Sequence, residues 1–320
     1  MKALQAHALE MSNEIARSLE LAMLLEVSAY PKPGNVHRTR NFHDTKYEHF
    51  LASAVACRTG FEDAAKRGIL IANHRLNPEH AEVGNAIRDA TLNTMRFQRG
   101  GNTSLGVVTL LVPLAVAAGM AFTTHGRSLR SLRLKLRRVI ESTTTADAVA
   151  FYEAVASSRP GGLGTVSHLD LLDPTSKSEI FRHKIKLLEI FQLARGWDSI
   201  CLEWTTNYSI TFDLGYPFFK KELSKTDDVN EATVDTYLRI LSEKPDTLIS
   251  RKAGLEKARW VSNRAKRILA LGGAKTRQGR AQLEKLDEGL GINGNLLNPG
   301  ATADLTASVV AIALLSGYTP

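Results

Sequence analysis

The sequence holds little cysteine and few aromatic residues, and it almost lacks the alternation of polar and apolar residues that marks β-strands. Cys57 and Cys201 are the only cysteines among 320 residues, and no CxxC pair occurs. These two thiols predict neither a disulfide framework nor a zinc site, and they fit a reducing, cytoplasmic environment. Only residues 198–212 read partly as a strand. We therefore predict an all-α fold.

Apolar residues recur at spacings of three and four, which predicts a series of amphipathic helices. The predicted helices cover residues 3–28, 46–72, 81–97, 104–120, 128–141, 146–156, 177–195, 230–242, 253–270, 279–289 and 300–316. The runs at 105–122 and 305–315 are apolar on nearly all faces, so we expect buried neighbours at the centre of the fold. Candidate linkers at 157–165 and 271–279 do not separate regions of different composition. Residues 1–320 are therefore predicted to form a single compact domain.

The apolar run at 105–122 approaches the length of a membrane span. It contains Pro113 and lacks flanking aromatic belts, so we predict a buried core helix and no membrane contact. The first 25 residues carry Glu10, Glu14 and Arg17 through their middle, and we expect no signal peptide there.

Basic residues outnumber acidic ones, 41 against 33, which gives a formal net charge of +8. This excess favours an anionic partner but does not choose between nucleic acid, acidic lipid and polyphosphate. The densest basic run, at 127–139, keeps its leucines on one helix side and has no interleaved aromatic residues. That pattern is typical of a solvated helix face, so we predict no nucleic-acid partner.

The segment "YPKPGNVHRTRNFHDTKYEHF" at 30–50 concentrates residues that end a helix and residues that bind anions. Pro31 and Pro33 prevent the preceding helix from continuing, and Gly34 permits an unusual turn. Basic donors follow closely on this stiffened loop: Lys32, His37, Arg38 and Arg40. Glu26 lies in the last helical turn, where the helix dipole disfavours a carboxylate unless a cation compensates it. We favour a polyanion-binding loop over a basic surface connection between helices.

Three further segments place polar groups at predicted helix starts. "RGGNTSLGVV" at 99–108 offers free backbone N–H groups, although it lacks the Gly-Lys-Ser/Thr of a P-loop and also fits simple capping. "PDTLISRKAG" at 245–254 adds Asp246, Thr247, Arg251 and Lys252. "NPGATAD" at 298–304 places Asp304 on a small, apolar helix face, where a carboxylate is either partnered in a structural ion pair or functional.

These segments resemble the triphosphoribosyl-dephospho-coenzyme A synthase family. The matching residues are "EVSAYPKPGNVHR", "FHD", "GGNTSLG", "PDTLISRKAG" and "NPGATADLTAS", in family order from about residue 20 to 316. The resemblance implies a single all-α domain that joins ATP to 3′-dephospho-coenzyme A and expels adenine. The chain departs from the pathway enzymes at Thr103-Ser104-Leu105-Gly106, where they carry a histidine and a lysine, and at Asn35-Val36-His37, where they carry an acid. It looks like a divergent, archaeal-like branch, whose acceptor the resemblance leaves open.

The resemblance also implies roles for individual residues. The predicted catalytic residues are Glu26, His43, Asp44 and Asp304, with His43 as the proton carrier and Glu26 and Asp304 as ligands of Mg²⁺. The residues predicted to bind ATP and the acceptor are Lys32, Gly34, Asn35, His37, Arg38, Gly101, Asn102, Thr103, Asp246, Arg251, Lys252, Asn298, Gly300 and Thr302.

Two other functions compete with this transferase. The His43-Asp44 pair favours a metal-dependent phosphohydrolase of the HD type, which is also all-α. The missing histidine and lysine favour a helical nucleotide-binding protein without turnover. The predicted partners are ATP and a nucleotide-like small molecule, with a homodimer left open.

Overall fold

Two apolar helices, α4 (Leu105–His125) and α15 (Gly300–Leu315), form the centre of the fold. Helix α4 is long and apolar enough to cross a membrane, yet 89% of its apolar window is buried inside the protein. The two helices pack against each other, with α1 (Lys2–Ser28) against both of them. Burial of nearly all of their side chains explains why neither helix has a polar face. The predicted buried central helices are confirmed.

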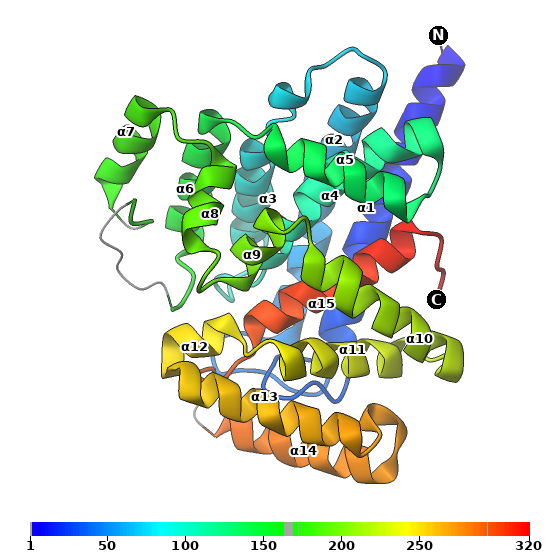
Figure 1. Ribbon diagram of the computed structural model, residues 1–320, viewed down its shortest axis with the longest axis vertical. Coiled ribbons are helices and arrows are strands. Elements are labelled where there is room, and N and C mark those ends of the chain that lie inside the picture. The colour runs from blue at the N-terminus through cyan, green and yellow to red at the C-terminus, as the bar shows by residue number, and fades with distance from the viewer. Residues whose placement is uncertain (1, 163–168, 172, 293) are drawn as a thin grey trace.

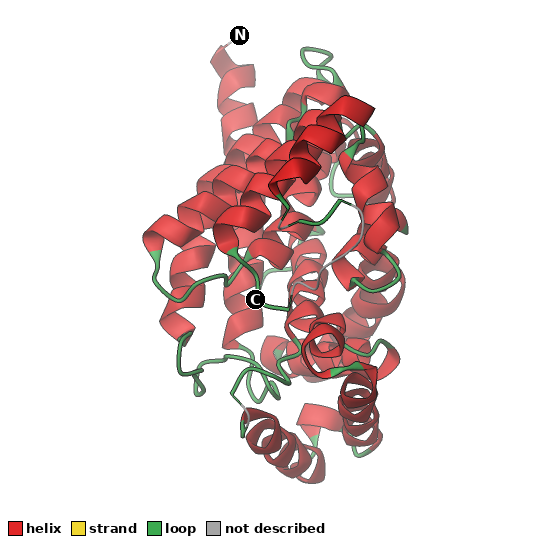
Figure 2. Ribbon diagram, turned by 90° about the vertical axis from the view of Figure 1, so that its left-hand side faces the viewer, coloured by secondary structure: helices red, strands yellow, loops and turns green. Residues whose placement is uncertain are grey.

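We describe a computed structural model of residues 2–162, 169–171, 173–292 and 294–320. Within these ranges every named element is helical, and the one β-contact is an isolated bridge between His37 and Arg40 (Figures 1 and 2). The all-α prediction is confirmed. The α-helices not yet named are α2 (Tyr47–Ala72), α3 (Val83–Phe97), α5 (Leu129–Glu141), α6 (Thr145–Ser158), α7 (Pro174–His183), α8 (Leu187–Ala194), α9 (Ser199–Thr205), α10 (Tyr216–Thr226), α11 (Val229–Glu243), α12 (Thr247–Ala253), α13 (Leu255–Ala270) and α14 (Arg277–Gly291).

Two local predictions were wrong. The helix predicted at 177–195 is two helices, because Lys184 adopts a left-handed conformation (φ 54°) that ends α7 before α8 begins. The strand-like stretch at 198–212 forms α9 and the first part of a π-helix, Ile210–Gly215. The buried carboxylate of Glu203 accepts hydrogen bonds from the N–H groups of Ile210 (2.7 Å) and Thr211 (2.9 Å). It thereby satisfies donors that a helix start leaves free.

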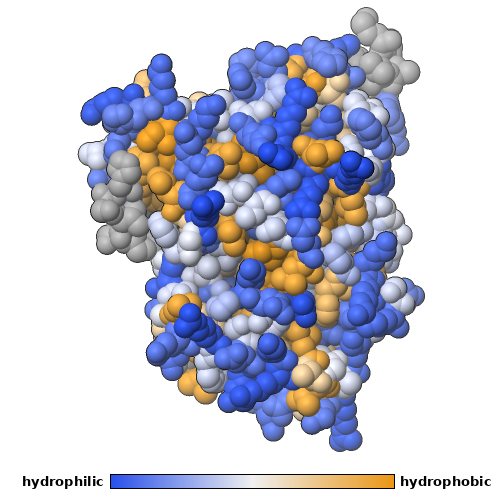
Figure 3. Space-filling model, viewed as in Figure 1, coloured by the Kyte–Doolittle hydropathy of each residue, from blue (hydrophilic) through white to orange (hydrophobic). Residues whose placement is uncertain are grey.

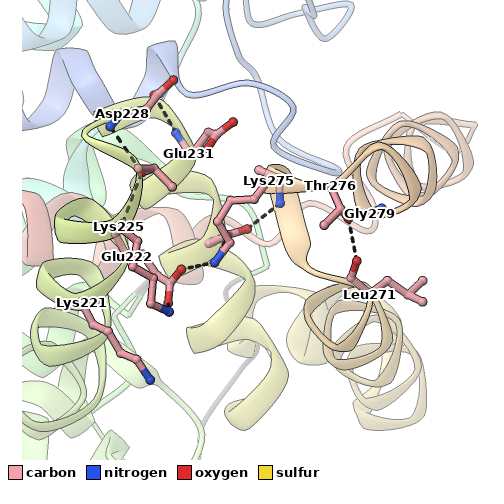
Figure 4. Close-up of polar contacts among 12 residues, drawn as sticks. Lys221, Glu222, Lys225, Asp228, Glu231, Leu271, Lys275, Thr276 and Gly279 are labelled. Atoms are coloured by element: carbon pink, nitrogen blue, oxygen red, sulfur yellow. Dashed lines mark hydrogen bonds and ion pairs between the residues drawn. The ribbon is translucent and has the colours of Figure 1, made fainter.

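Helices α11 to α14 form the lower part of the molecule in Figure 1 around a second cluster of buried apolar residues, to which α15 contributes Ala303. Ion pairs join this part to α10. Figure 4 shows Glu222 of α10 and Lys275, which precedes α14, pointing toward each other. Nζ of Lys275 also lies 3.6 Å from Oδ2 of Asp235 in α11. The carboxylate of Asp235 accepts a hydrogen bond from the N–H of Ala274 (2.7 Å).

The surface agrees with the sequence patterns. Helix α5 buries Leu132, Leu136 and Val139 and exposes Arg137 and Arg138, as expected for a solvated amphipathic helix. Figure 3 shows a mostly hydrophilic face on which hydrophobic residues gather toward the middle. The predicted linker at 157–165 falls partly outside the described residues. The linker predicted at 271–279 contains a short 3₁₀ helix, Gly273–Lys275, and the first residues of α14.

Candidate active site

A cavity of about 1000 Å³ is bordered by helices from both ends of the chain and from its middle. Its walls come from the end of α1 and the following loop, the start of α4, the helices α6, α8 and α9, and the facing starts of α12 and α15. Typical small-molecule sites measure about 300–1000 Å³. A cavity at the upper end of that range has room for two nucleotide-sized substrates.

Segments far apart in the sequence meet in this cavity. The predicted site residues that line it are Glu26, Asn35, Asp44, Gly101, Asn102, Thr103, Arg251, Lys252, Asn298, Gly300 and Asp304. The proline-containing loop near the N-terminus and the "NPGATAD" segment therefore border one space, although more than 250 residues separate Glu26 from Asp304.

The loop after α1 is fixed to α14 by Asp287. The carboxylate of Asp287 accepts the N–H of Gly34 (2.9 Å) and pairs with His37 (3.3 Å) and Arg40 (2.7 Å). Burial acts to raise the pKa of Asp287, but these three groups together hold it below its ordinary value. Gly34 has φ 77° and close neighbours, so the turn requires glycine. Gly34 and His37 thus position the loop and do not themselves line the cavity.

Other predicted site residues also lie off the cavity, among them His43, which was predicted to be catalytic. Arg38 is exposed over the ring of Tyr30, with 5.6 Å from its Cζ to the ring centroid, and His43 is exposed on the same loop. Asp246 is buried, and its carboxylate accepts four hydrogen bonds of 2.8–3.0 Å, from Leu248, Ile249 and both the N–H and the hydroxyl of Thr302. Asp246 and Thr302 thereby join the starts of α12 and α15 behind the cavity wall.

Glu26 and Lys32 form a buried ion pair beside the cavity. The ammonium of Lys32 contacts Oε1 of Glu26 and donates to its backbone carbonyl at 2.9 Å. Burial raises the pKa of Glu26 and lowers the pKa of Lys32, and each partner opposes the effect on the other. The cation that the sequence required near Glu26 is therefore Lys32. The ammonium of Lys32 binds Glu26, and Lys32 does not line the cavity, whereas Glu26 does.

Asp304 lies against the first turn of α4. A Cβ atom on Gly106 would lie only 2.0 Å from Oδ2 of Asp304, so glycine is needed for this approach. The N–H of Val107 favours the ionised carboxylate, as expected at a helix N-terminus. Burial and the nearby charges of Glu26, Asp246 and Asp198 outweigh it and raise the pKa of Asp304 well above its ordinary value. The site therefore favours the protonated carboxylic acid.

The last turn of α12 supplies cations to the cavity. Nη1 of Arg251 lies 2.6 Å from Oδ2 of Asp198, and Nζ of Lys252 lies 3.3 Å from the backbone carbonyl of Asn295. Nε of Arg251 and Oδ1 of Asn298 are buried without a hydrogen-bond partner among the described residues. Buried polar atoms are nearly always paired, so these two atoms mark a place for a ligand's polar groups.

The loop before α4 is also ordered by hydrogen bonds. Asn102 caps the helix, with its Oδ1 accepting the N–H of Leu105 at 3.0 Å, and the hydroxyl of Thr103 lies 2.6 Å from that of Ser53. Gly101 has φ 72°, and a Cβ atom at this position would meet nothing within 4 Å, so Gly101 faces open space. The helix start thus offers a small polar surface beside Asp304.

Mg²⁺ was predicted on Glu26 and Asp304. The described residues contain no cluster of three or more potential metal ligands. Mg²⁺ nevertheless commonly uses one or two protein carboxylates and takes its other oxygens from phosphates and water. Both carboxyl groups line the cavity and repel each other, so they fit such an ion when a polyphosphate is present.

Several cavity residues were not predicted from the sequence. Asp198, Asn295 and Trp197 complete the polar end and the mouth, while Phe151 and Phe191 belong to the apolar wall. Asp198 lay in the stretch misread as strand. Its place before α9, whose Ile200 and Cys201 N–H groups it caps, is the signal that could have found it.

An all-helical fold around a large cavity with cationic, carboxylic and apolar walls is suited to phosphorylated small molecules. The comparisons narrow this class. The profile of the ATP:dephospho-CoA triphosphoribosyl transferase family matches residues 12–320, and the chain belongs to this family. The family and the names of the relatives indicate a transferase.

The related proteins match this chain over different shares of their sequences. A probable 2-(5''-triphosphoribosyl)-3'-dephosphocoenzyme-A synthase of Pseudomonas fluorescens (strain Pf0-1) is 25% identical over 95% of this chain and 92% of its own length. One of Azotobacter vinelandii is 34% identical, but over only 29% of this chain and 31% of its own. A crystal structure from Archaeoglobus fulgidus, provisionally named a triphosphoribosyl-dephospho-coA synthase, superimposes with a TM-score of 0.60 at 26% identity and covers 84% of this chain and 100% of its own.

Proposed function

We propose that this protein transfers the triphosphoribosyl group of ATP to a hydroxyl of 3′-dephospho-coenzyme A or a related nucleotide-like acceptor, with release of adenine. The observation that carries the proposal is the cavity itself. It brings the carboxyl groups of Glu26 and Asp304 into one space with the cations of Arg251 and Lys252. Family membership supplies the reaction class.

The cations in the last turn of α12 and the unpartnered polar atoms of Arg251 and Asn298 are suited to phosphate groups. Arg251 and Lys252 would hold the triphosphate, and Asn102 and Thr103, which also line the cavity, would offer further polar contacts to it. Mg²⁺ held by Glu26 and Asp304 would supply further neutralisation of the triphosphate charge. A carboxyl that binds Mg²⁺ must be ionised, so Asp304 cannot hold the ion and donate a proton at the same time.

The transfer forms a bond from the acceptor oxygen to C1′ of the ATP ribose and breaks the bond from C1′ to adenine. The electron pair of the broken bond goes to adenine, which takes up a proton, and the attacking hydroxyl loses one. Protonated Asp304 is suited to donate to the leaving base, and the carboxylate of Glu26 to face the positive charge that develops at C1′. Asp44, which lines the cavity and is exposed, is suited to accept the hydroxyl proton. His43 lies nearby in the sequence but outside the cavity lining.

The function is tested by incubating the protein with ATP, MgCl₂ and a panel of acceptors that includes 3′-dephospho-coenzyme A. Mass spectrometry should detect free adenine and an acceptor heavier by one triphosphoribosyl group. Release of inorganic phosphate without adenine would instead support the HD-type phosphohydrolase. Binding of ATP in calorimetry without any product would support the non-catalytic nucleotide-binding protein.

A further inference from the structure

Two large apolar side chains stand exposed at the mouth of the cavity. Twelve large hydrophobic residues are exposed in the described part of the chain, and of these only Leu193 and Trp197 line the cavity. Trp197 is 51% exposed, whereas Asp304 is enclosed at the start of α4. The indole therefore lies at the entrance and the carboxyl groups lie at the bottom.

Hydrogen bonds and an ion pair fix the backbone at Trp197 and at the next residue. Its N–H donates to the carbonyl of Ala194 at 3.1 Å. The next residue, Asp198, caps α9 and pairs with Arg251. Asp198 and Asp304 both line the cavity. Trp197 is thus held next to the Asp198–Arg251 pair at the phosphate end of the cavity.

The indole of Trp197 lacks a packing partner of the kind that the other tryptophans have. Trp204 packs edge-on against Phe191, with ring centroids 4.7 Å apart, and Arg264 lies over Trp260 at 5.3 Å. Among the described residues, no ring or cation occupies a face of Trp197 in this way. An exposed aromatic face at a cavity mouth is a platform for a flat ligand ring, because every nucleobase offers a π-face for stacking.

We propose that Trp197 stacks on the adenine of the acceptor, the base that stays attached during the reaction. This inference rests on the proposed function, in which two adenines enter one cavity. The adenine expelled from ATP must reach a proton donor, and the proposed donor, Asp304, is partly buried against the first turn of α4. The acceptor's adenine needs no proton, and it is attached to the same ribose as the attacking hydroxyl. Trp197 at the mouth is placed for this second base and would distinguish a nucleotide acceptor from other hydroxyl compounds.

Tryptophan fluorescence tests the stacking without relying on turnover. In a Trp260→Phe protein, the remaining tryptophans are Trp197 and the buried Trp204. Titration with 3′-dephospho-coenzyme A should quench the emission, and Trp197→Phe in the same background should abolish the quenching. 4′-Phosphopantetheine, which has no adenine, should leave the emission unchanged, as should ATP with Mg²⁺. Equal quenching by either of these probes, or none by 3′-dephospho-coenzyme A, would overturn the assignment.

Kinetics supply a second measurement. Loss of one aromatic stack typically weakens binding of a base roughly 5- to 150-fold. Trp197→Ala should therefore raise KM for the acceptor by at least roughly fivefold and leave KM for ATP unchanged. Trp197→Phe, which keeps an aromatic face, should restore most of the affinity, and Trp260→Ala should behave as wild type. An increase in KM for ATP alone would assign Trp197 to the leaving adenine. If the wild type released no adenine at all, the proposed function would fail, while the quenching titration would still decide the stacking.

Discussion

Replacing Gly106 with alanine should disable the site while leaving the fold intact. The added Cβ would lie 2.0 Å from Oδ2 of Asp304, and ordinary contact begins at 3.4 Å, so the carboxyl group or α4 must move by about 1.4 Å. A misplacement of about 1 Å at a reacting centre can lower the rate roughly 100-fold. We therefore expect kcat for adenine release to fall by about two orders of magnitude. The assay is chromatographic detection of adenine under saturating ATP and acceptor.

The matched control is Gly289→Ala, in α14. A Cβ atom there would meet nothing within 4 Å, and the helix should gain up to about 1 kcal/mol because alanine has the higher helix propensity. Its kcat should equal that of the wild type. Circular dichroism should show the same helix content in both variants. A Gly106→Ala protein with wild-type kcat would refute the role of Asp304 in the reaction.

Three further outcomes follow from the buried charges. Asp304→Asn should raise the melting temperature, because the folded protein then no longer holds a carboxyl group whose ionised form is disfavoured, and should lower kcat roughly 10²- to 10⁴-fold in the adenine assay. Lys32→Ala should lower stability by about 3–5 kcal/mol in urea unfolding, because Glu26 loses its buried partner. Burial raises the pKa of Glu203 from 4.5 to about 7 despite its hydrogen bonds, so the folded state binds its proton more tightly than the unfolded state does. Its contribution to stability is full below pH 4.5 and is lost as pH rises through about 7, and urea titrations of Glu203→Gln should lack that loss.

The sequence predicted the centre of the fold because the signal there is simple. Helices α4 and α15 are apolar on all faces and are buried on all faces. Prediction was wrong where tertiary contacts decide the backbone. At 198–212 the β-branched residues resemble a strand, but the buried carboxylate of Glu203 stabilises a helix start at Ile210 that no local pattern reveals. At Lys184 a single left-handed residue divides one predicted helix into two.

The sequence could identify the segments of the site more readily than the direction of each side chain. Prolines, glycines and helix caps marked the loops before α2, α4, α12 and α15, but not the loop before α9. The same signals could not show that His37 faces Asp287, because that partner lies 250 residues away and no motif links the two. Asp246 likewise looked like a ligand-binding acid and lies instead behind the wall, bonded to Thr302. Trp197 carried no signal, since only the folded structure shows which exposed aromatic residue borders the cavity.

The two carboxyl groups at the bottom of the cavity stand in opposite helix environments. Glu26 lies at the C-terminal end of α1, where the dipole disfavours its charge, and Lys32 compensates it. Asp304 of α15 lies against the N-terminal end of α4, where the dipole favours its charge, yet burial and the charge of Glu26 raise its pKa well above the ordinary value. A bound triphosphate adds negative charge nearby and raises the pKa of Asp304 further. In the proposed reaction, the charge of bound ATP would therefore favour the protonated Asp304 that the departure of adenine requires, provided that Asp304 does not hold Mg²⁺ at that step.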